Sequence, residues 1–150
     1  MNIKLIAIDL DGTTMKSNDT LSYGNKSAIE SAISSGIYVV PTTGRALNGL
    51  PKELMELGIK YAVTSNGSSV IDIEKNKLIY SNCLPNNICK KIVTEMNQYN
   101  LYMDLYIQGK GYAEKRFLDN LNSQNIPHER KILIQKTRTP VNNLIEFIDT

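Results

Sequence analysis

Two aspartates separated by one residue follow an apolar segment near the amino terminus. The β-rich segment runs from Ile3 to Asp9, and Asp11 comes next, beside Gly12. Two carboxylates this close repel each other unless one is protonated or a cation lies between them. Such oxygen ligands suit hard divalent ions, Mg²⁺ above all where phosphate is the substrate. One carboxylate could attack phosphorus, and the other could act as general acid toward the leaving oxygen.

The same Asp-x-Asp-Gly spacing occurs in ordinary turns and in calcium loops. An EF-hand loop is disfavoured because its third ligand position and its distal Glu are not in register here. An EF-hand also needs a helix before the loop, whereas an apolar strand is predicted at this place. An ordinary turn without chemistry stays open as the alternative for this segment taken alone.

A second polar segment, Thr42-Thr43-Gly44-Arg45, follows the next apolar strand, about one βαβ unit along the chain. A right-handed crossover can bring the two strand ends side by side. Thr43 could then offer its hydroxyl and N–H to a phosphate on Asp9, and Arg45 could supply charge or a bidentate clamp. The alternative is a helix start with a capping Thr. The two segments together favour phosphoryl chemistry.

Alternating strand and helix patterns position these segments. The first half predicts a βαβαβ arrangement with a parallel sheet buried on both faces. Its first helix is capped by Ser22 or Asn25. We expect strands at 3–9, 37–40 and 61–63, with helices over 22–35 and 47–57.

The pattern changes after Asn66-Gly67, where a hairpin, further helices and a strand are predicted. A boundary near 82–85 separates a domain over 1–82 from a second one over 83–150. Asn142 is expected to cap the last helix. The predicted elements are a hairpin of 69–73 with 78–81, a helix over 85–98, a strand over 101–107 and a helix near 113–121.

Composition excludes several function classes. The 150 residues carry 17 Lys and Arg against 15 Asp and Glu, a net charge of +2. The charges form no long run of one sign, which disfavours a nucleic-acid partner. No apolar stretch is long enough to span a membrane, and no signal peptide is evident, so we expect a cytoplasmic protein without membrane contact.

Other candidate residues have plainer interpretations. His128 is expected to be a solvated side chain, and Tyr99, Tyr102, Tyr106 and Tyr112 are expected to cover the sheet of the second domain. A basic group near the carboxyl end could attract an anionic substrate, although a solvated sheet edge is the favoured interpretation. That group is Arg130, Lys131, Lys136 and Arg138.

The segments Asp9-Leu10-Asp11-Gly12-Thr13, Val39 to Arg45, and Ser65-Asn66-Gly67 together resemble the haloacid dehalogenase (HAD) superfamily. More narrowly they resemble its Cof-type (class IIB) phosphatases, specifically over residues 1–81 and only in architecture beyond. The resemblance implies an α/β protein with a Rossmann-like parallel-sheet core, of which 1–82 would be the first half. Residues 83–150 would be part of an α/β cap of the C2 type, which selects substrates.

The resemblance also implies roles for these residues. Asp9 would be the nucleophile and Asp11 the acid and base. Mg²⁺ would be the cofactor, bound by Asp9 and by the backbone carbonyl of Asp11. Asn66 and Gly67 would line the substrate entrance. The full set implied to bind substrate or phosphate is Leu10, Gly12, Thr43, Gly44, Arg45, Asn66 and Gly67.

Two family motifs are missing from this sequence. The family carries a later Lys that neutralises phosphate and a Gly-Asp segment that completes the metal site, and no Gly-Asp dipeptide occurs here. We therefore expect the amino-terminal portion of a longer enzyme, inactive or weakly active as 150 residues, because positioning and electrostatics dominate this catalysis.

The expected parent activity is Mg²⁺-dependent hydrolysis of a small phosphorylated metabolite, such as a sugar phosphate, through an aspartyl-phosphate. The alternative is a non-catalytic module that binds phosphate and Mg²⁺ or accepts a phosphoryl group. Response-regulator receivers act in this way, but their acidic pair lies on a separate strand from the phosphorylated Asp. A structural fragment without activity is a third possibility.

Overall fold

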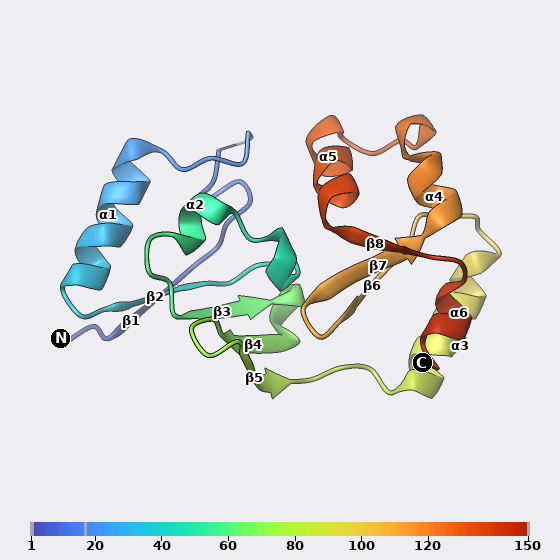
Figure 1. Ribbon diagram of the computed structural model, residues 1–150, viewed down its shortest axis with the longest axis horizontal. Helices are drawn as coiled ribbons and strands as arrows, with labels where there is room; N and C mark the ends of the chain where they lie inside the picture. Colours follow the sequence, from blue (N-terminus) through green and yellow to red (C-terminus); the bar gives the residue numbers. More distant parts are fainter. Residues whose placement is uncertain (1, 17, 150) are drawn as a thin grey trace. The chain divides into compact units, whose positions relative to one another are not determined.

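A computed structural model describes residues 2–16 and 18–149 of the chain. The chain divides into two compact units, Met1–Asn82 and Cys83–Thr150. Figure 1 colours the first from blue to green and the second from yellow to red. Each unit is described by itself below. Among the described residues, no helix combines the length and the apolar character that a membrane crossing requires.

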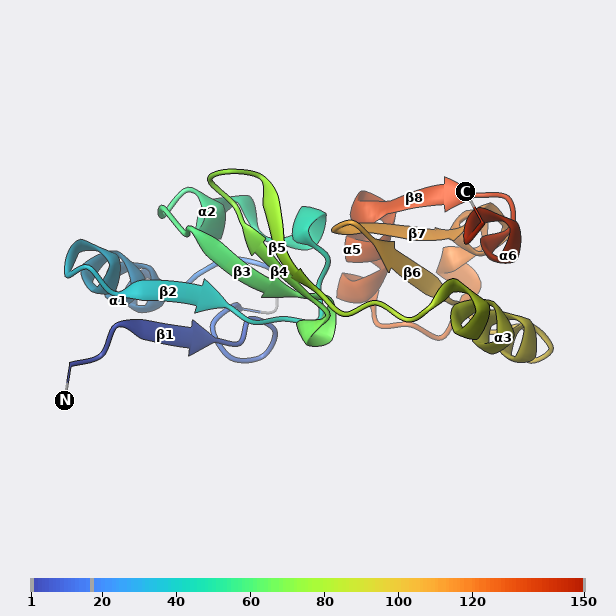
Figure 2. The same ribbon diagram turned by 90° about the horizontal axis from the view of Figure 1, so that it is seen from below.

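The first unit is built on parallel strands. β1 (Leu5–Ile8) pairs with β2 (Tyr38–Pro41), and α1 (Tyr23–Ser34) connects them. β3 (Tyr61–Thr64) runs parallel to the end of β2 through a bridge between Thr42 and Val63. Figures 1 and 2 show these strands side by side. The α/β class predicted from the sequence is confirmed.

Local sequence explains where α1 begins and ends. The Ser22 hydroxyl accepts the N–H of Asn25 at 3.0 Å, which satisfies one of the unpaired donors of the first turn. After the helix, Gly36 has a φ of 77°, which a residue without a Cβ adopts readily. Of the two caps predicted for this helix, the structure therefore selects Ser22.

The second predicted helix is mostly irregular. A 3₁₀ turn, Leu47–Gly49, precedes the short α2 (Lys52–Met55), and Pro51 stands between them without an N–H to continue a helix. The predicted burial of Leu54 on the apolar face of this segment is correct, because its side chain is fully buried. The predicted hairpin is present as β4 (Ser69–Asp72) and β5 (Lys77–Ser81), antiparallel to each other and added to β3.

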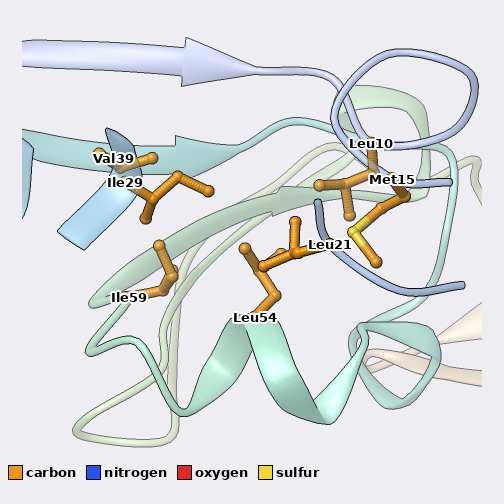
Figure 3. Packing of buried hydrophobic residues seen from close by; sticks show 7 residues of the cluster. All are labelled: Leu10, Met15, Leu21, Ile29, Val39, Leu54 and Ile59. Atoms are coloured by element: carbon orange, nitrogen blue, oxygen red, sulfur yellow. The ribbon is translucent and has the colours of Figure 1, made fainter. Parts of the chain in front are cut away.

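The core of this unit lies beneath the sheet (Figure 3). Side chains from α1, β2, α2, the loop after β1 and the segment before β3 meet there: Leu10, Met15, Leu21, Ile29, Val39, Leu54 and Ile59. β2 is buried as expected, but β1 is not, since Leu5 is 54% exposed. The expectation of burial on both faces is wrong for β1 within the described residues, because it lies at the sheet edge with β2 as its paired strand.

Thr64, at the end of β3, is expected to lower the stability of the first unit. Its side chain is fully buried, and its hydroxyl has no hydrogen-bond partner among the described residues. A buried polar group without a partner is destabilising. We expect Thr64→Val, which keeps the shape, to raise the free energy of unfolding by about 1 kcal/mol in urea titrations. Thr64→Ser, which keeps the hydroxyl and removes a methyl group, should lower it, and a stabilising Ser variant would contradict this explanation.

The second unit contains a three-stranded sheet. β7 (Lys110–Glu114) lies between the antiparallel β6 (Asp104–Ile107) and the parallel β8 (Arg138–Val141). α3 (Asn86–Asn97) and α6 (Leu144–Phe147) share a core around Val93, Leu144 and Ile148. α4 (Lys115–Asp119) and α5 (His128–Thr137) complete the unit and bury Phe117 and Ile134.

Three sequence predictions shift in this unit. The helix expected near Ala113 begins at Lys115, because Ala113 is buried in β7 and pairs with Asp104. The strand expected from residue 101 begins at Asp104. The last helix is capped by Asn143 rather than Asn142, since its side-chain oxygen accepts the N–H of Ile145 at 2.8 Å.

The solvated edge predicted for the basic group is wrong for Arg138. Its side chain is only 6% exposed, and its Nε–H donates to Asp104 Oδ2 at 2.6 Å. The guanidinium lies 4.9 Å from the centre of the Tyr106 ring. Gly111 makes room for it, because a Cβ there would be 2.6 Å from Arg138 Cδ. Arg138 is therefore part of the interior of the second unit.

Candidate active site

A tight turn at the end of β1 presents the two aspartates. The Leu10 carbonyl accepts the N–H groups of Thr13, Thr14 and Met15, at 3.3, 3.1 and 2.9 Å. Gly12 has a φ of 74° inside this turn, a conformation that favours glycine. Leu10 is fully buried in the core, whereas Asp9 and Asp11 on either side of it are exposed. Burial of Leu10 thus turns both carboxylates toward solvent.

Neighbouring hydroxyl groups orient Asp9. The Thr13 hydroxyl donates to Asp9 Oδ2 at 2.7 Å, and the Thr14 hydroxyl donates to the Asp9 carbonyl at 2.6 Å. The N–H of Thr42 donates to the Ile8 carbonyl at 2.8 Å, so the ends of β1 and β2 lie side by side. Because of this contact, Asp9 and the loop that begins at Thr43 lie at the same end of the sheet, where β1 and β2 finish.

The loop after β2 is held to the end of β3. The N–H of Thr43 donates to the Val63 carbonyl at 3.0 Å, and the N–H of Asn66 donates to the Thr43 carbonyl at 3.2 Å. The buried hydroxyl of Thr43 accepts the N–H of Arg45 at 3.2 Å. The second and third sequence segments therefore form one connected structure.

Asn66 packs directly over Gly44. A Cβ added to Gly44 would be 2.7 Å from Asn66 Oδ1, so a larger residue at position 44 would displace the Asn66 side chain. Ser65, Asn66 and Gly67 have φ values of 52°, 57° and 89°, which is the left-handed region. Non-glycine residues rarely adopt it, and such strain often accompanies functional sites. Asn66 and Gly67 are exposed at this turn.

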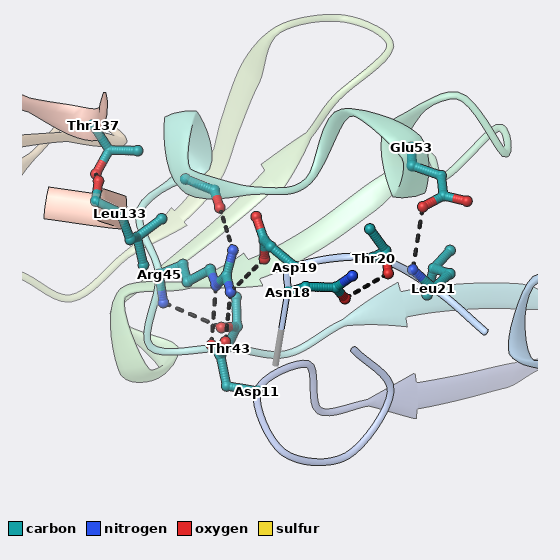
Figure 4. A network of polar contacts seen from close by, with 11 residues as sticks. Asp11, Asn18, Asp19, Thr20, Leu21, Thr43, Arg45, Glu53, Leu133 and Thr137 are labelled. Carbon is teal, nitrogen blue, oxygen red and sulfur yellow. Dashed lines mark hydrogen bonds and ion pairs between the residues drawn. The ribbon is translucent and has the colours of Figure 1, made fainter. Parts of the chain in front are cut away.

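Arg45 connects the first and second segments (Figure 4). Its Nε–H and Nη2–H donate to the two oxygens of Asp11 at 3.0 and 2.5 Å. Nη2 also contacts Asp19 Oδ1 at 2.7 Å, although Arg45 itself is only 9% exposed. Burial would lower the pKa of Arg45, but hydrogen bonds and charge from Asp11 and Asp19 outweigh it. The pKa of this guanidinium consequently lies above its ordinary value.

The exposed carboxylates provide a donor set that suits Mg²⁺ in part. Among residues 2–16 and 18–149, no three His, Cys, Asp or Glu side chains gather into a cluster that could hold a metal by themselves. Mg²⁺ commonly binds through one or two carboxylates together with waters and substrate phosphate oxygens. The Asp9 carboxylate fits this partial role. Both carboxylate oxygens of Asp11 are bound by Arg45, so the ligand expected from Asp11 is its backbone carbonyl.

Sequence reasoning missed the residues that hold the loop between β1 and α1. Asp19 binds Arg45, Glu53 Oε2 accepts the N–H of Leu21 at 3.2 Å, and the Asn25 side chain donates to the Thr14 carbonyl at 2.8 Å. The Asn18-Asp19 pair is a turn signal, but no local pattern identifies its distant partner.

Comparison with known proteins identifies the class to which this fold and these strand-end segments belong. The family described as haloacid dehalogenase-like hydrolase matches residues 6–149, and the chain belongs to this family. Relatives and solved structures agree with this family assignment.

Two relatives of this chain are named as phosphatases. Phosphatase YwpJ of Bacillus subtilis is 34% identical over 140 residues, which cover 89% of this chain and 49% of that protein. The 5-amino-6-(5-phospho-D-ribitylamino)uracil phosphatase YcsE of Bacillus subtilis is 39% identical over 77 residues, covering 51% of this chain and 31% of that protein. The chain thus spans about half the length, or less, of these relatives.

Solved structures agree on the fold. A haloacid dehalogenase-like hydrolase from B. subtilis has a TM-score of 0.78 at 26% identity, covering 99% of this chain and 57% of that one. The HAD subclass IIB sugar phosphatase BT4131 has a TM-score of 0.72 at 18% identity, covering 98% of this chain and 55% of that one. The second likeness concerns the fold alone.

Proposed function

We propose that the protein hydrolyses small phosphomonoesters of the sugar-phosphate type, with Mg²⁺, through an aspartyl-phosphate. The observation that carries the proposal is the exposed Asp9–Asp11 turn at the sheet edge that also bears the Thr43 loop. Phosphatase relatives support it, one of them named for a phosphorylated ribityl substrate.

Asp9 is the nucleophile in this proposal. The Thr13 hydroxyl holds Asp9 Oδ2, which leaves Oδ1 to attack phosphorus. A bond forms between Oδ1 and phosphorus while the bond from phosphorus to the leaving alcohol oxygen breaks. Asp11 gives its proton to that oxygen and then takes one from the water that hydrolyses the acyl phosphate.

The remaining predicted residues, apart from Arg45, bind the phosphoryl group and the substrate. Thr43 accepts a backbone hydrogen bond and keeps its own hydroxyl proton to donate. Gly12 and Gly44 allow close backbone approach, and the buried side chain of Leu10 restricts that residue to backbone contacts. Asn66 and Gly67 stand at the substrate entrance.

Asp9 would hold Mg²⁺ with its carboxylate, and Asp11 would hold it with its backbone carbonyl. When bound, the ion neutralises negative charge on the phosphate and on the Asp9 carboxylate.

Removal of Mg²⁺ tests the proposal. With Mg²⁺ present, we expect the chain to release phosphate slowly from a panel of sugar phosphates and an aryl phosphate. Chelation should lower this rate by about 10²-fold or more, and added Mg²⁺ should restore it. Continuous detection of phosphate gives the rate, and calorimetry with inorganic phosphate gives binding in parallel.

The other possible results of these assays would indicate a different function. Phosphate binding without release would identify a non-catalytic binding module and overturn the proposed activity. Stable phosphorylation by acetyl phosphate without turnover would identify a phospho-acceptor module instead. A chain that neither binds nor releases phosphate would contradict both.

A further inference from the structure

We propose that Arg45 is a positioning residue that clamps Asp11 and the flap loop, instead of the phosphoryl ligand that the sequence suggested. The flap loop is defined as the described residues 13–16 and 18–21, between β1 and α1. The inference rests on the proposed function for its consequence in catalysis. Its structural basis is the set of contacts around one buried guanidinium.

Most N–H donors of Arg45 are engaged by protein groups. Nε and Nη2 bind both oxygens of Asp11, and Nη2 also binds Asp19. Nη1 donates to the Gly49 carbonyl at 3.0 Å. Four of the five N–H donors of the guanidinium therefore have protein partners, and the side chain is 9% exposed. A phosphoryl group could reach the donors on Nε and Nη2 only by displacing the carboxylates that Arg45 already holds.

The two carboxylates belong to different segments. Asp11 lies in the turn that follows β1, whereas Asp19 lies in the flap loop, with a φ of 64°. Backbone bridges join Met15 both to Asp11 and to Leu21, so the flap loop continues from the aspartate turn. One guanidinium thus sets the orientation of Asp11 and the position of the flap loop together.

Arg45 is itself fixed to the rest of the site. Its N–H donates to the Thr43 hydroxyl, and its carbonyl accepts the N–H of Ser65 at 2.9 Å. The planar fork of Arg matches both oxygens of one carboxylate, a geometry that the point charge of Lys cannot reproduce. Clamping by Arg45 therefore links Asp11 to the segments that follow β2 and β3.

Arg45→Lys separates positioning from phosphate binding. If Arg45 positions Asp11, kcat should fall by about tenfold or more while KM stays within about twofold, because misplacement affects the reaction more than binding. Amide exchange of Lys16, Asp19 and Leu21 should accelerate by about tenfold in the same variant. A rise in KM or in the Kd of inorganic phosphate of about tenfold, with unchanged exchange, would instead establish a phosphate ligand and overturn the proposal.

Asp19→Asn removes only the flap-loop arm of the clamp. We expect amide exchange in the flap loop to accelerate as in Arg45→Lys, with a smaller loss of kcat. Glu74→Gln, which breaks the exposed pair with Lys60 in the same unit, is the matched control and should change neither quantity. Unchanged exchange in Asp19→Asn would also refute the clamp.

Failure of the clamp and failure of the proposed function are distinguishable. Amide exchange reports on the clamp whether or not the chain turns over substrate. A wild-type chain without phosphate release would refute the proposed function, while exchange in the two variants would still decide the clamp.

Discussion

Replacing Asp9 with Asn is expected to lower the rate of phosphate release by on the order of 10³-fold or more, to the background. The amide keeps the size of the side chain and can still interact with the Thr13 hydroxyl, but it is a poor nucleophile toward phosphorus. Acid-quenched samples analysed by mass spectrometry should show phosphorylation of the wild-type chain and none at residue 9 of the variant. Equal rates in the two proteins would remove Asp9 from the nucleophile role.

Two further variants sharpen the result for Asp9. Glu56→Gln changes an exposed carboxylate on the same unit, which pairs with Lys52, and should leave the rate unaltered. Thr13→Val removes the hydroxyl that holds Asp9 Oδ2 and should reduce the rate by about tenfold, through orientation alone. A full loss in Glu56→Gln would show that the assay reports folding and not chemistry.

Asp104→Ala is expected to lower the free energy of unfolding of the second unit by about 3–5 kcal/mol. The substitution leaves the Arg138 guanidinium, 6% exposed, without its carboxylate partner in the interior. It also removes the acceptor for the Tyr102 hydroxyl, at 3.2 Å. Urea unfolding followed by circular dichroism measures the loss, and hydrogen exchange should locate it in β6, β7 and β8.

An exposed ion pair and a double variant test the explanation for Asp104. Asp119→Asn breaks an exposed pair with Lys115 and should cost no more than about 0.5 kcal/mol. Adding Arg138→Met to Asp104→Ala removes the unpaired charge and should recover a large part of the lost stability. If Asp104→Ala costs no more than Asp119→Asn, burial of this pair does not stabilise the unit.

Local patterns were sufficient for much of the first unit. Apolar runs ended by turn residues predicted β1, β2 and β3, and the capping pattern placed the start of α1 within the predicted choices. The prediction failed where a local helix signal competed with strand pairing in the folded unit. Alanine favours helices, yet Ala113 lies buried in β7 and pairs with Asp104 of β6.

The sequence by itself determined the α/β class and the strand ends at which Asp9, Thr43 and Asn66 stand, and the resemblance of its motifs indicated the family. The class and the strand ends depend on residues close together in the chain, so periodicity and turn signals suffice to reveal them. Only the tertiary structure decided the partners of Arg45 and the burial of Arg138. Each guanidinium meets carboxylates from distant segments, and chain folding alone brings those segments into contact. A basic side chain in a sequence reveals its charge, whereas its neighbours decide whether that charge binds a ligand or holds the protein together.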